Sequence, residues 1–274
     1  MPAQPARAPA QDAPILLRET IGPIALLTLN RPAARNSLSE AMIAQLHAAL
    51  TDSGEDTNIR AVVIAANGPA FSSGHDLKEL TARRQDADRG RAYFAQIMNA
   101  CSAMMQAIVH LPKPVVAAVQ GVATAAGCQI VASCDLAVAS ENAAFATPGV
   151  DIGLFCSTPM VALSRNVSRK HAMEMLLTGE PVSAGTAKNI GLINRVVPVG
   201  TERDAAIELA QKIALKSAHT VKLGKTAFYR QAEMSLGDAY RYAAEVMTEN
   251  MMARDAEEGI CAFIEKRAPK WQDR

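Results

Sequence analysis

The sequence lacks an excess of charge of either sign, and it lacks paired cysteines. Its 274 residues carry a formal net charge of +1, with acidic and basic residues mixed along the chain, so no general attraction to nucleic acid is expected. The five cysteines are odd in number and show no Cys-x-x-Cys spacing: Cys101, Cys128, Cys134, Cys156 and Cys261. They indicate buried thiols in a reducing compartment, and neither a disulfide framework nor a zinc site. A reactive thiol at Cys128 or Cys156 is a second interpretation.

No segment has the pattern of a secretion signal or of a membrane span. Residues 1–13 are mainly proline, alanine and glutamine and are poor in arginine and serine, so we expect a disordered tail. Residues 114–134 carry no charge, but their glycines and alanine runs favour a strand, a turn and a buried helix. We expect a soluble protein without a membrane or nucleic-acid partner. Its expected location is the cytoplasm, or the mitochondrial matrix if the source is eukaryotic.

The common nucleotide and metal motifs are also missing. There is no G-x-G-x-x-G after a strand, no Walker lysine motif and no H-E-x-x-H, and the five histidines are dispersed at positions 47, 75, 110, 171 and 219. No metal site is therefore expected. The length allows one substantial core with a small second region.

Strand-like and helix-like segments alternate in the first half of the chain. Apolar β-type runs are predicted at residues 15–19, 24–29, 61–65, 115–119, 136–139 and 144–146, and helices after the capping box at Ser37, at 90–110 and at 126–133. After Pro159 helical spacing dominates, at 168–178, 184–190, 202–216, 218–231 and 235–267, with one short β run at 193–197. This order predicts an α/β core over residues 14–200 and a helical region over residues 201–274.

Two turns of small residues are the most informative feature. Ala70-Phe-Ser-Ser-Gly-His-Asp-Leu-Lys-Glu-Leu80 and Gly121-Val-Ala-Thr-Ala-Ala-Gly-Cys-Gln129 each connect a β-branched apolar run to a helical run. Paired turns of this kind can offer two backbone N–H groups to one oxygen, which is an oxyanion hole.

The two turns resemble the enoyl-CoA hydratase/isomerase (crotonase) family, and the resemblance extends over about residues 15–271. The first turn and the segment Phe145-Ala-Thr-Pro-Gly-Val-Asp-Ile-Gly-Leu-Phe155 resemble one branch of that family in particular. The resemblance implies a superhelix of repeated β-β-α units with a C-terminal helical region that builds trimers, often paired into hexamers. It also implies that a thioester oxygen is held by the backbone amides of His75 and Ala126. Family members often carry a run of glycines at Ala125-Ala126-Gly127, and we expect this difference to be mild.

The catalytic glutamates of a hydratase are absent. The resemblance places them at Gln129 and Gly149, where this chain has an amide that cannot exchange a proton and a residue without a side chain. Asp151 is the nearest carboxylate; an extended backbone would let it reach the pocket, and a turn or cap ahead of Gly153 is the alternative. A direct role for the His75 imidazole is a further alternative.

The coenzyme A contacts of the family are better preserved. The resemblance assigns such contacts to Arg31, Ala33 and Ala34, to Ser73, Asp76, Leu77 and Lys78, and to Phe263 and Lys266, the last two given by a neighbouring subunit. For each lysine a solvated surface charge is the alternative.

The leading hypothesis is a protein that binds an acyl-CoA thioester and polarises its carbonyl, in fatty acid metabolism, with doubtful hydratase activity. Coenzyme A is part of the substrate, so no separate cofactor is expected; the other expected partner is the chain itself, as a homotrimer or a dimer of trimers. One alternative is isomerisation, decarboxylation or hydrolysis of a thioester at the same oxyanion hole. Another is an acyl-CoA-binding or modulatory protein without catalysis.

Overall fold

The computed structural model describes residues 13–274. The tail predicted over residues 1–13 therefore lies, apart from Ala13, outside the described residues. No helix within residues 13–274 is both long and apolar enough to cross a membrane.

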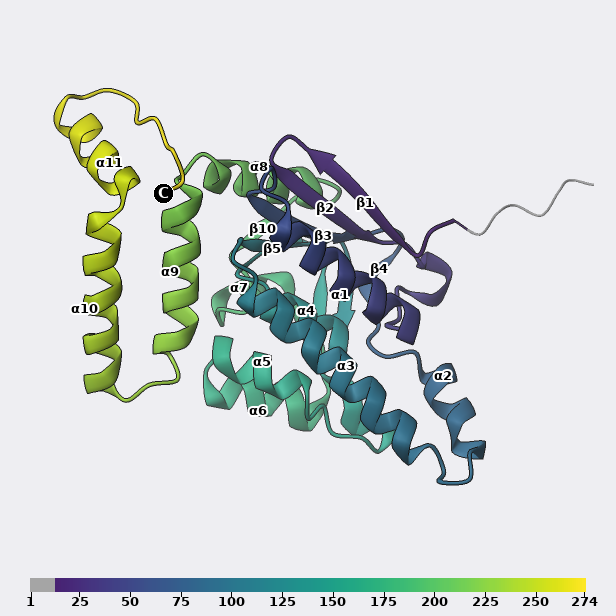
Figure 1. Cartoon of the computed structure of the whole chain (residues 1–274). Coiled ribbons are helices and arrows are strands. Elements are labelled where there is room, and N and C mark those ends of the chain that lie inside the picture. The colour runs from purple at the N-terminus through teal and green to yellow at the C-terminus, as the bar shows by residue number, and fades with distance from the viewer. Residues whose placement is uncertain (1–12) are drawn as a thin grey trace, which may run out of the picture.

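The larger of two sheets lies in the upper part of the body in the view of Figure 1. Its six strands lie in the order β1 (Leu16–Ile21), β2 (Ile24–Leu29), β3 (Ala61–Ala66), β5 (Val115–Val119), β7 (Leu136–Ser140) and β10 (Arg195–Val197). All neighbours pair in parallel except β1 and β2, which form an antiparallel hairpin. Parallel strands are usually covered on both faces, which explains why β2, β3 and β5 read as continuous apolar runs.

The smaller sheet contains the strands that follow directly along the chain. Its order is β4 (Ala70–Ser72), β6 (Val122–Thr124), β8 (Ala144–Ala146) and β9 (Val182–Ser183). Each of β3, β5 and β7 in the larger sheet is thus followed by a strand of the smaller sheet and then by a helix. This repeated β-β-α order confirms the predicted crotonase-like α/β fold. Sequence reasoning took β4 and β6 as parts of turns, because three residues are too few to show a period.

Helices cover both faces of the larger sheet. On one face, α1 (Glu40–Glu55), α3 (Arg91–His110) and α4 (Ala126–Ser133) contribute to the main core. On the other face, Ala206 and Ala210 of α8 (Glu202–Ala214) pack against residues of β2, β3, β5 and β7. The remaining helices of the body are α2 (Leu77–Ala82), α5 (Pro159–Asn166), α6 (Arg169–Thr178) and α7 (Ala184–Asn189).

The last three helices form an arm that projects from the body (Figure 1). They are α9 (Ala218–Gln231), α10 (Leu236–Met252) and α11 (Arg254–Ile264), and neither α9 nor α10 has a fully buried residue. The continuous helix predicted over residues 235–267 is wrong, because Ala253 has an extended backbone (ψ 144°) that separates α10 from α11. Cys261 is exposed on this arm, whereas the other four cysteines are buried as predicted.

A buried ion pair attaches the arm to the body. The Asp135 carboxylate accepts hydrogen bonds from Lys225 Nζ at 2.6 Å, from the Tyr229 hydroxyl at 2.9 Å and from the Val115 amide at 2.7 Å. The Lys225 side chain is 7 % exposed, and burial lowers its pKa while Asp135 opposes the shift. Moving α9 away from the body would break this pair and leave a buried charge without its partner, which is costly. The contacts therefore fix α9 against the start of β5 and β7.

Candidate functional site

The two small-residue turns lie directly against each other. A Cβ atom at Gly74 would lie 2.9 Å from Ala125 Cβ and 3.2 Å from Ala126 N, and one at Gly127 would lie 2.3 Å from Ser72 O. Gly74 also has a φ of +83°, which side chains rarely adopt. Both positions therefore require glycine, because any side chain would push the two turns apart.

The amides of His75 and Ala126 are free donors on these turns. Leu38 pairs with the residues on either side of His75, since its amide donates to Gly74 O and its carbonyl accepts from Asp76 N. Ala126 is the first residue of α4, where an N–H has no partner within the helix. Within residues 13–274 neither amide donates a hydrogen bond. Two free donors on abutting turns, one of them at a helix N-terminus, can bind a single oxygen.

Ala125, directly before the free amide of Ala126, has a strained backbone. Its φ of 49° and ψ of −118° lie in a region that only glycine adopts easily. Alanine at this position is therefore strained, whereas the glycine that family members often carry would not be. The strain costs on the order of 1–3 kcal/mol and is maintained by the surrounding packing.

Two polar side chains beside the turns are buried without partners. Both ring nitrogens of His75 are buried and form no hydrogen bond with any described residue. Burial lowers the pKa of His75, so its imidazole is neutral at pH 7. Gln129 is 5 % exposed and lies one turn beyond Ala126, and its Oε1 has no donor within residues 13–274. Unpaired buried groups of this kind call for a ligand or a bound water.

The segment after β8 is helical, and not extended, at Asp151. Residues Pro148–Ile152 form a 3-10 helix (η3), so the extended backbone that would have aligned Gly149 with Asp151 is absent. The Asp151 side chain is exposed and lies beside Gly179. The turn interpretation is therefore the correct one for this residue.

Gly149 is enclosed by the residues that follow it. A Cβ atom there would lie 2.9 Å from Leu154 O and 3.0 Å from Cys156 Sγ. A carboxylate could occupy this position only if residues 154–156 moved.

The residues assigned to coenzyme A fall into two groups. The first group lies beside the first turn. It contains Arg31 and the 3-10 helix η1 (Pro32–Ala34), with Ala33 and Ala34. The contact is a hydrogen bond from Ser73 N to Arg35 O, directly after η1. Leu77 and Lys78 are exposed at the start of α2. Phe263, which is 85 % exposed, and Lys266 lie on the arm, at the opposite end of the molecule from α2 (Figure 1). Within one chain the structure does not bring the second group to the first.

Arg31 and Asp76 bind each other and hold the first turn in place. Arg31 donates to the Asp76 carboxylate at 3.2 Å, and Ser37 Oγ donates to the same oxygen at 3.1 Å. Burial raises the pKa of Asp76, but these hydrogen bonds and the Lys78 amide outweigh it and lower the pKa overall. Asp76 also caps α2. Both side chains thus position the first turn, a role that sequence reasoning did not assign to them.

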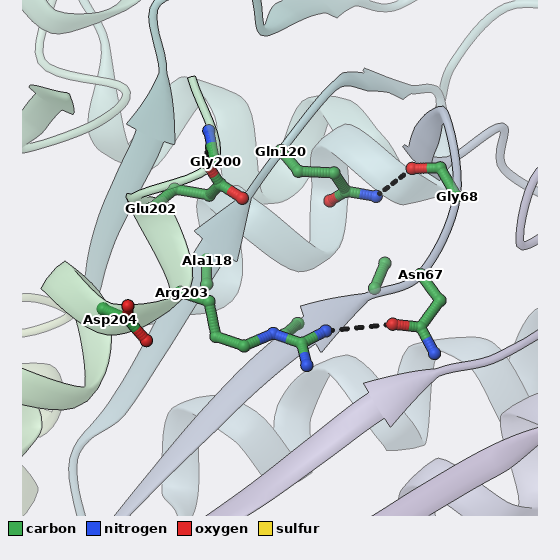
Figure 2. Close-up of a pocket in the computed structure, with 10 residues that line it drawn as sticks. Asn67, Gly68, Ala118, Gln120, Gly200, Glu202, Arg203 and Asp204 are labelled. Atoms are coloured by element: carbon green, nitrogen blue, oxygen red, sulfur yellow. Dashed lines mark hydrogen bonds between the residues drawn. The ribbon is translucent and has the colours of Figure 1, made fainter. Parts of the chain in front are cut away.

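A separate polar cavity of about 310 Å³ lies between the ends of β3 and β5 and the start of α8 (Figure 2). Arg203 donates to Asn67 Oδ1 at 3.0 Å and Gln120 Nε2 to Gly68 O at 3.1 Å. None of the residues predicted for the site line this cavity. Groups of three or more histidine, cysteine, aspartate or glutamate side chains suited to a metal are not found within residues 13–274.

The chain is similar to known proteins over nearly its whole length. It matches the family described as Enoyl-CoA hydratase/isomerase over residues 19–274. It is 46 % identical to the human protein named "Enoyl-CoA hydratase domain-containing protein 3, mitochondrial", over 98 % of this chain and 87 % of that protein. The predicted resemblance, including its branch, is therefore confirmed.

Two solved structures have the same fold. The crystal structure of an enoyl-CoA hydratase from Mycobacterium smegmatis is 51 % identical, with a TM-score of 0.89 over 94 % of this chain and 99 % of that one. The crystal structure of human enoyl Coenzyme A hydratase domain-containing protein 3 is 46 % identical, also with a TM-score of 0.89, over 94 % of this chain and all of that one.

Replacing Ala125 by glycine should stabilise the protein. Glycine relieves the strain at φ 49°, and this gain exceeds the larger entropy of the unfolded chain. We expect Ala125→Gly to raise the free energy of unfolding by about 1 kcal/mol in urea titrations. Ala44→Gly, at an exposed position inside α1, is the matched control and should lower it by about 1 kcal/mol. A loss of stability in both variants would show that Ala125 is not strained.

Proposed function

The chain belongs to the enoyl-CoA hydratase/isomerase family, and we propose that it binds an acyl-CoA thioester and polarises the thioester carbonyl. The carbonyl oxygen would lie between the amides of His75 and Ala126. The observation that carries this proposal is the pair of donors without acceptors on two abutting turns. When the α carbon loses a proton or the carbonyl is attacked, charge gathers on that oxygen, and losing one donor typically costs about 3–4 kcal/mol.

The coenzyme A portion would lie along the outer side of the first turn. Ser73, Leu77 and the η1 residues Ala33 and Ala34 are exposed or half-buried there. Lys78 is exposed beside them and could meet a phosphate. We assign Arg31 and Asp76 to positioning this surface, because they are already bound to each other. Coenzyme A enters as part of the substrate, and no further cofactor is proposed.

Hydration would be slow at this site. It needs a base for the water and an acid for the α carbon, and each typically contributes about 10²–10⁴-fold. Gln129 cannot exchange a proton near pH 7, and the surroundings of Gly149 leave no room for a carboxylate. These two positions support a function in which the carbonyl is polarised without efficient addition of water.

The projecting arm supports assembly into a trimer or a dimer of trimers. Large apolar side chains are exposed on α6 and on the arm: Met173, Leu177, Met247 and Met251. Leu176, beside Leu177 on the same helix, is buried in the core. A neighbouring chain's arm would bring Phe263 and Lys266 to the coenzyme A surface. For location, we propose the cytoplasm or, in a eukaryote, the mitochondrial matrix.

Removing the thioester oxygen from the ligand should weaken binding. We expect butyryl-CoA to bind about tenfold more tightly than its thioether analogue S-butyl-CoA, because only the thioester oxygen accepts from both amides. Isothermal calorimetry measures both affinities, and competition with free coenzyme A checks that they share one site. Equal affinities would contradict the proposed oxyanion hole.

Crotonyl-CoA should be hydrated at least about 10²-fold more slowly than by a hydratase with both glutamates. The measurement is the loss of absorbance of the enoyl thioester. Gln129→Glu should raise the rate, since it restores one carboxylate beside Ala126. The matched control Gln106→Glu, on the exposed side of α3, should leave it unchanged. Efficient hydration by the unmodified protein would contradict the proposal.

Light scattering at micromolar concentration should give the mass of three or six chains. Met247→Asp places a charge on the exposed apolar side of α10 and should shift the protein toward monomers. A monomeric unmodified protein would overturn the proposed assembly and, with it, the placement of Lys266 beside a neighbour's ligand.

A further inference from the structure

Each of the two turns is reached through a short segment that leaves the larger sheet. Residues 67–69, the first crossover segment, lead from β3 into β4 and on to the first turn. Residues 120–121, the second crossover segment, lead from β5 into β6 and on to the second turn. The two segments abut, because a Cβ atom at Gly121 would lie 2.3 Å from Pro69 O. The relative position of the turns therefore depends on how these segments are joined.

The strands between the crossover segments and the turns pair over a short distance. β4 and β6 share two residue pairs, the second between Ser72 and Ala123, and the register shifts before it. So short and irregular a ladder specifies register weakly. His75 follows Ser72 by three residues, as Ala126 follows Ala123, so a slip of this ladder would move one free amide past the other. The contact of Gly127 with Ser72 O limits how close the turns come, but not how far apart they move.

The side chain of Gln120 joins the two crossover segments. Its Nε2 donates to Gly68 O at 3.1 Å (Figure 2) and to Ala70 O at 3.0 Å, on either side of Pro69. Both acceptors are carbonyl oxygens, so only the NH₂ end of the amide can face them. The other end, Oε1, is buried and has no donor within residues 13–274. The two Nε2 hydrogen bonds are thus the polar contacts that orient this side chain.

Other side chains contact the first crossover segment without reaching the second. Asn36 Nδ2 donates to Asn67 O and to Ala70 O, both at 2.8 Å. Arg203 donates to Asn67 Oδ1 at 3.0 Å, from the side of α8 (Figure 2). Among the side-chain hydrogen bonds of residues 13–274, those that connect residues 67–70 with residues 120–121 come from Gln120.

We propose that Gln120 is a positioning residue for the oxyanion hole, and that it fixes the separation of the His75 and Ala126 amides through β4 and β6. This inference rests on the proposed function, because it requires a thioester oxygen between the two amides. Gln120 lines the separate polar cavity and so acts from outside the site. A hydrogen bond weakens steeply outside its preferred distance and angle, so a small shift of one turn would cost one of the two donors.

Gln120→Met tests the proposal, because it keeps the length of the side chain and removes both N–H donors. The ligands are butyryl-CoA and S-butyl-CoA, for which we expect about tenfold discrimination by the unmodified protein. In Gln120→Met this ratio should fall to about twofold, while the affinity for free coenzyme A stays the same. Arg203→Met is the matched control: it lines the same cavity and loses a hydrogen bond to the first crossover segment, yet it should keep the ratio.

Infrared spectroscopy of butyryl-CoA with a ¹³C label at the thioester carbonyl provides a second measurement. Hydrogen bonds from both amides polarise the carbonyl and lower its stretching frequency on binding. We expect the full lowering in the unmodified protein and in Arg203→Met, and a smaller one in Gln120→Met. A substitution that only reduced the stability of the fold would leave the frequency of the bound ligand unchanged.

Two results would overturn the proposal while leaving the proposed function in place. One is full discrimination with the full frequency shift in folded Gln120→Met. The other is an equal loss in Gln120→Met and Arg203→Met, which would indicate a general loosening of the fold. If the unmodified protein does not distinguish the two ligands, the proposed function fails and this inference fails with it. If Gln120→Met does not fold, Gln120→Glu replaces it, since glutamate has the same shape and at pH 7 lacks both donors.

Discussion

The site depends on the close approach of two backbone turns. Gly127 lets the start of α4 reach Ser72 O, and Gly74 lets the first turn reach Ala125 and Ala126. A methyl group at either glycine would meet atoms at 2.3–2.9 Å, closer than van der Waals contact allows. The free amides of His75 and Ala126 can face one oxygen only while this approach is kept. Side-chain size at these few positions therefore matters more for the site than side-chain chemistry does.

The rest of the fold holds the two turns in register. The first turn follows β4 and the second follows β6, and these strands pair in parallel. Arg31, Ser37 and Asp76 then bind the first turn to η1, and the Leu38 bridge adds two backbone hydrogen bonds. The strain at Ala125 shows that this packing is firm, because a residue in that conformation would relax if its neighbours yielded. The Asp135–Lys225 ion pair does not contact the turns; it joins α9 of the arm to the body.

Long periodic segments and the two turns could be predicted from the sequence, and short or distant features could not. The buried strands β2, β3 and β5 and the helix α4 are as expected, since apolar runs and small residues leave a local signal. Strands of two or three residues, such as β6 and β9, are too short to show an alternation of apolar and polar residues. They are recognised only by their hydrogen bonds to the neighbouring strand β8. The break at Ala253 lies in a segment of unbroken helical spacing. Arg31 and Asp76 are 45 positions apart in the sequence, so no local pattern reveals that they bind each other.

The polar groups at the site define which chemistry it can support. The His75 imidazole is neutral because burial lowers its pKa, and Gln129 has no proton to exchange. Backbone amides such as these can stabilise an oxyanion, but they move no proton to or from carbon. A reaction that needs a separate acid and base is therefore disfavoured. The enclosure of Gly149 by Leu154 and Cys156 leaves no room for a carboxylate unless residues 154–156 move.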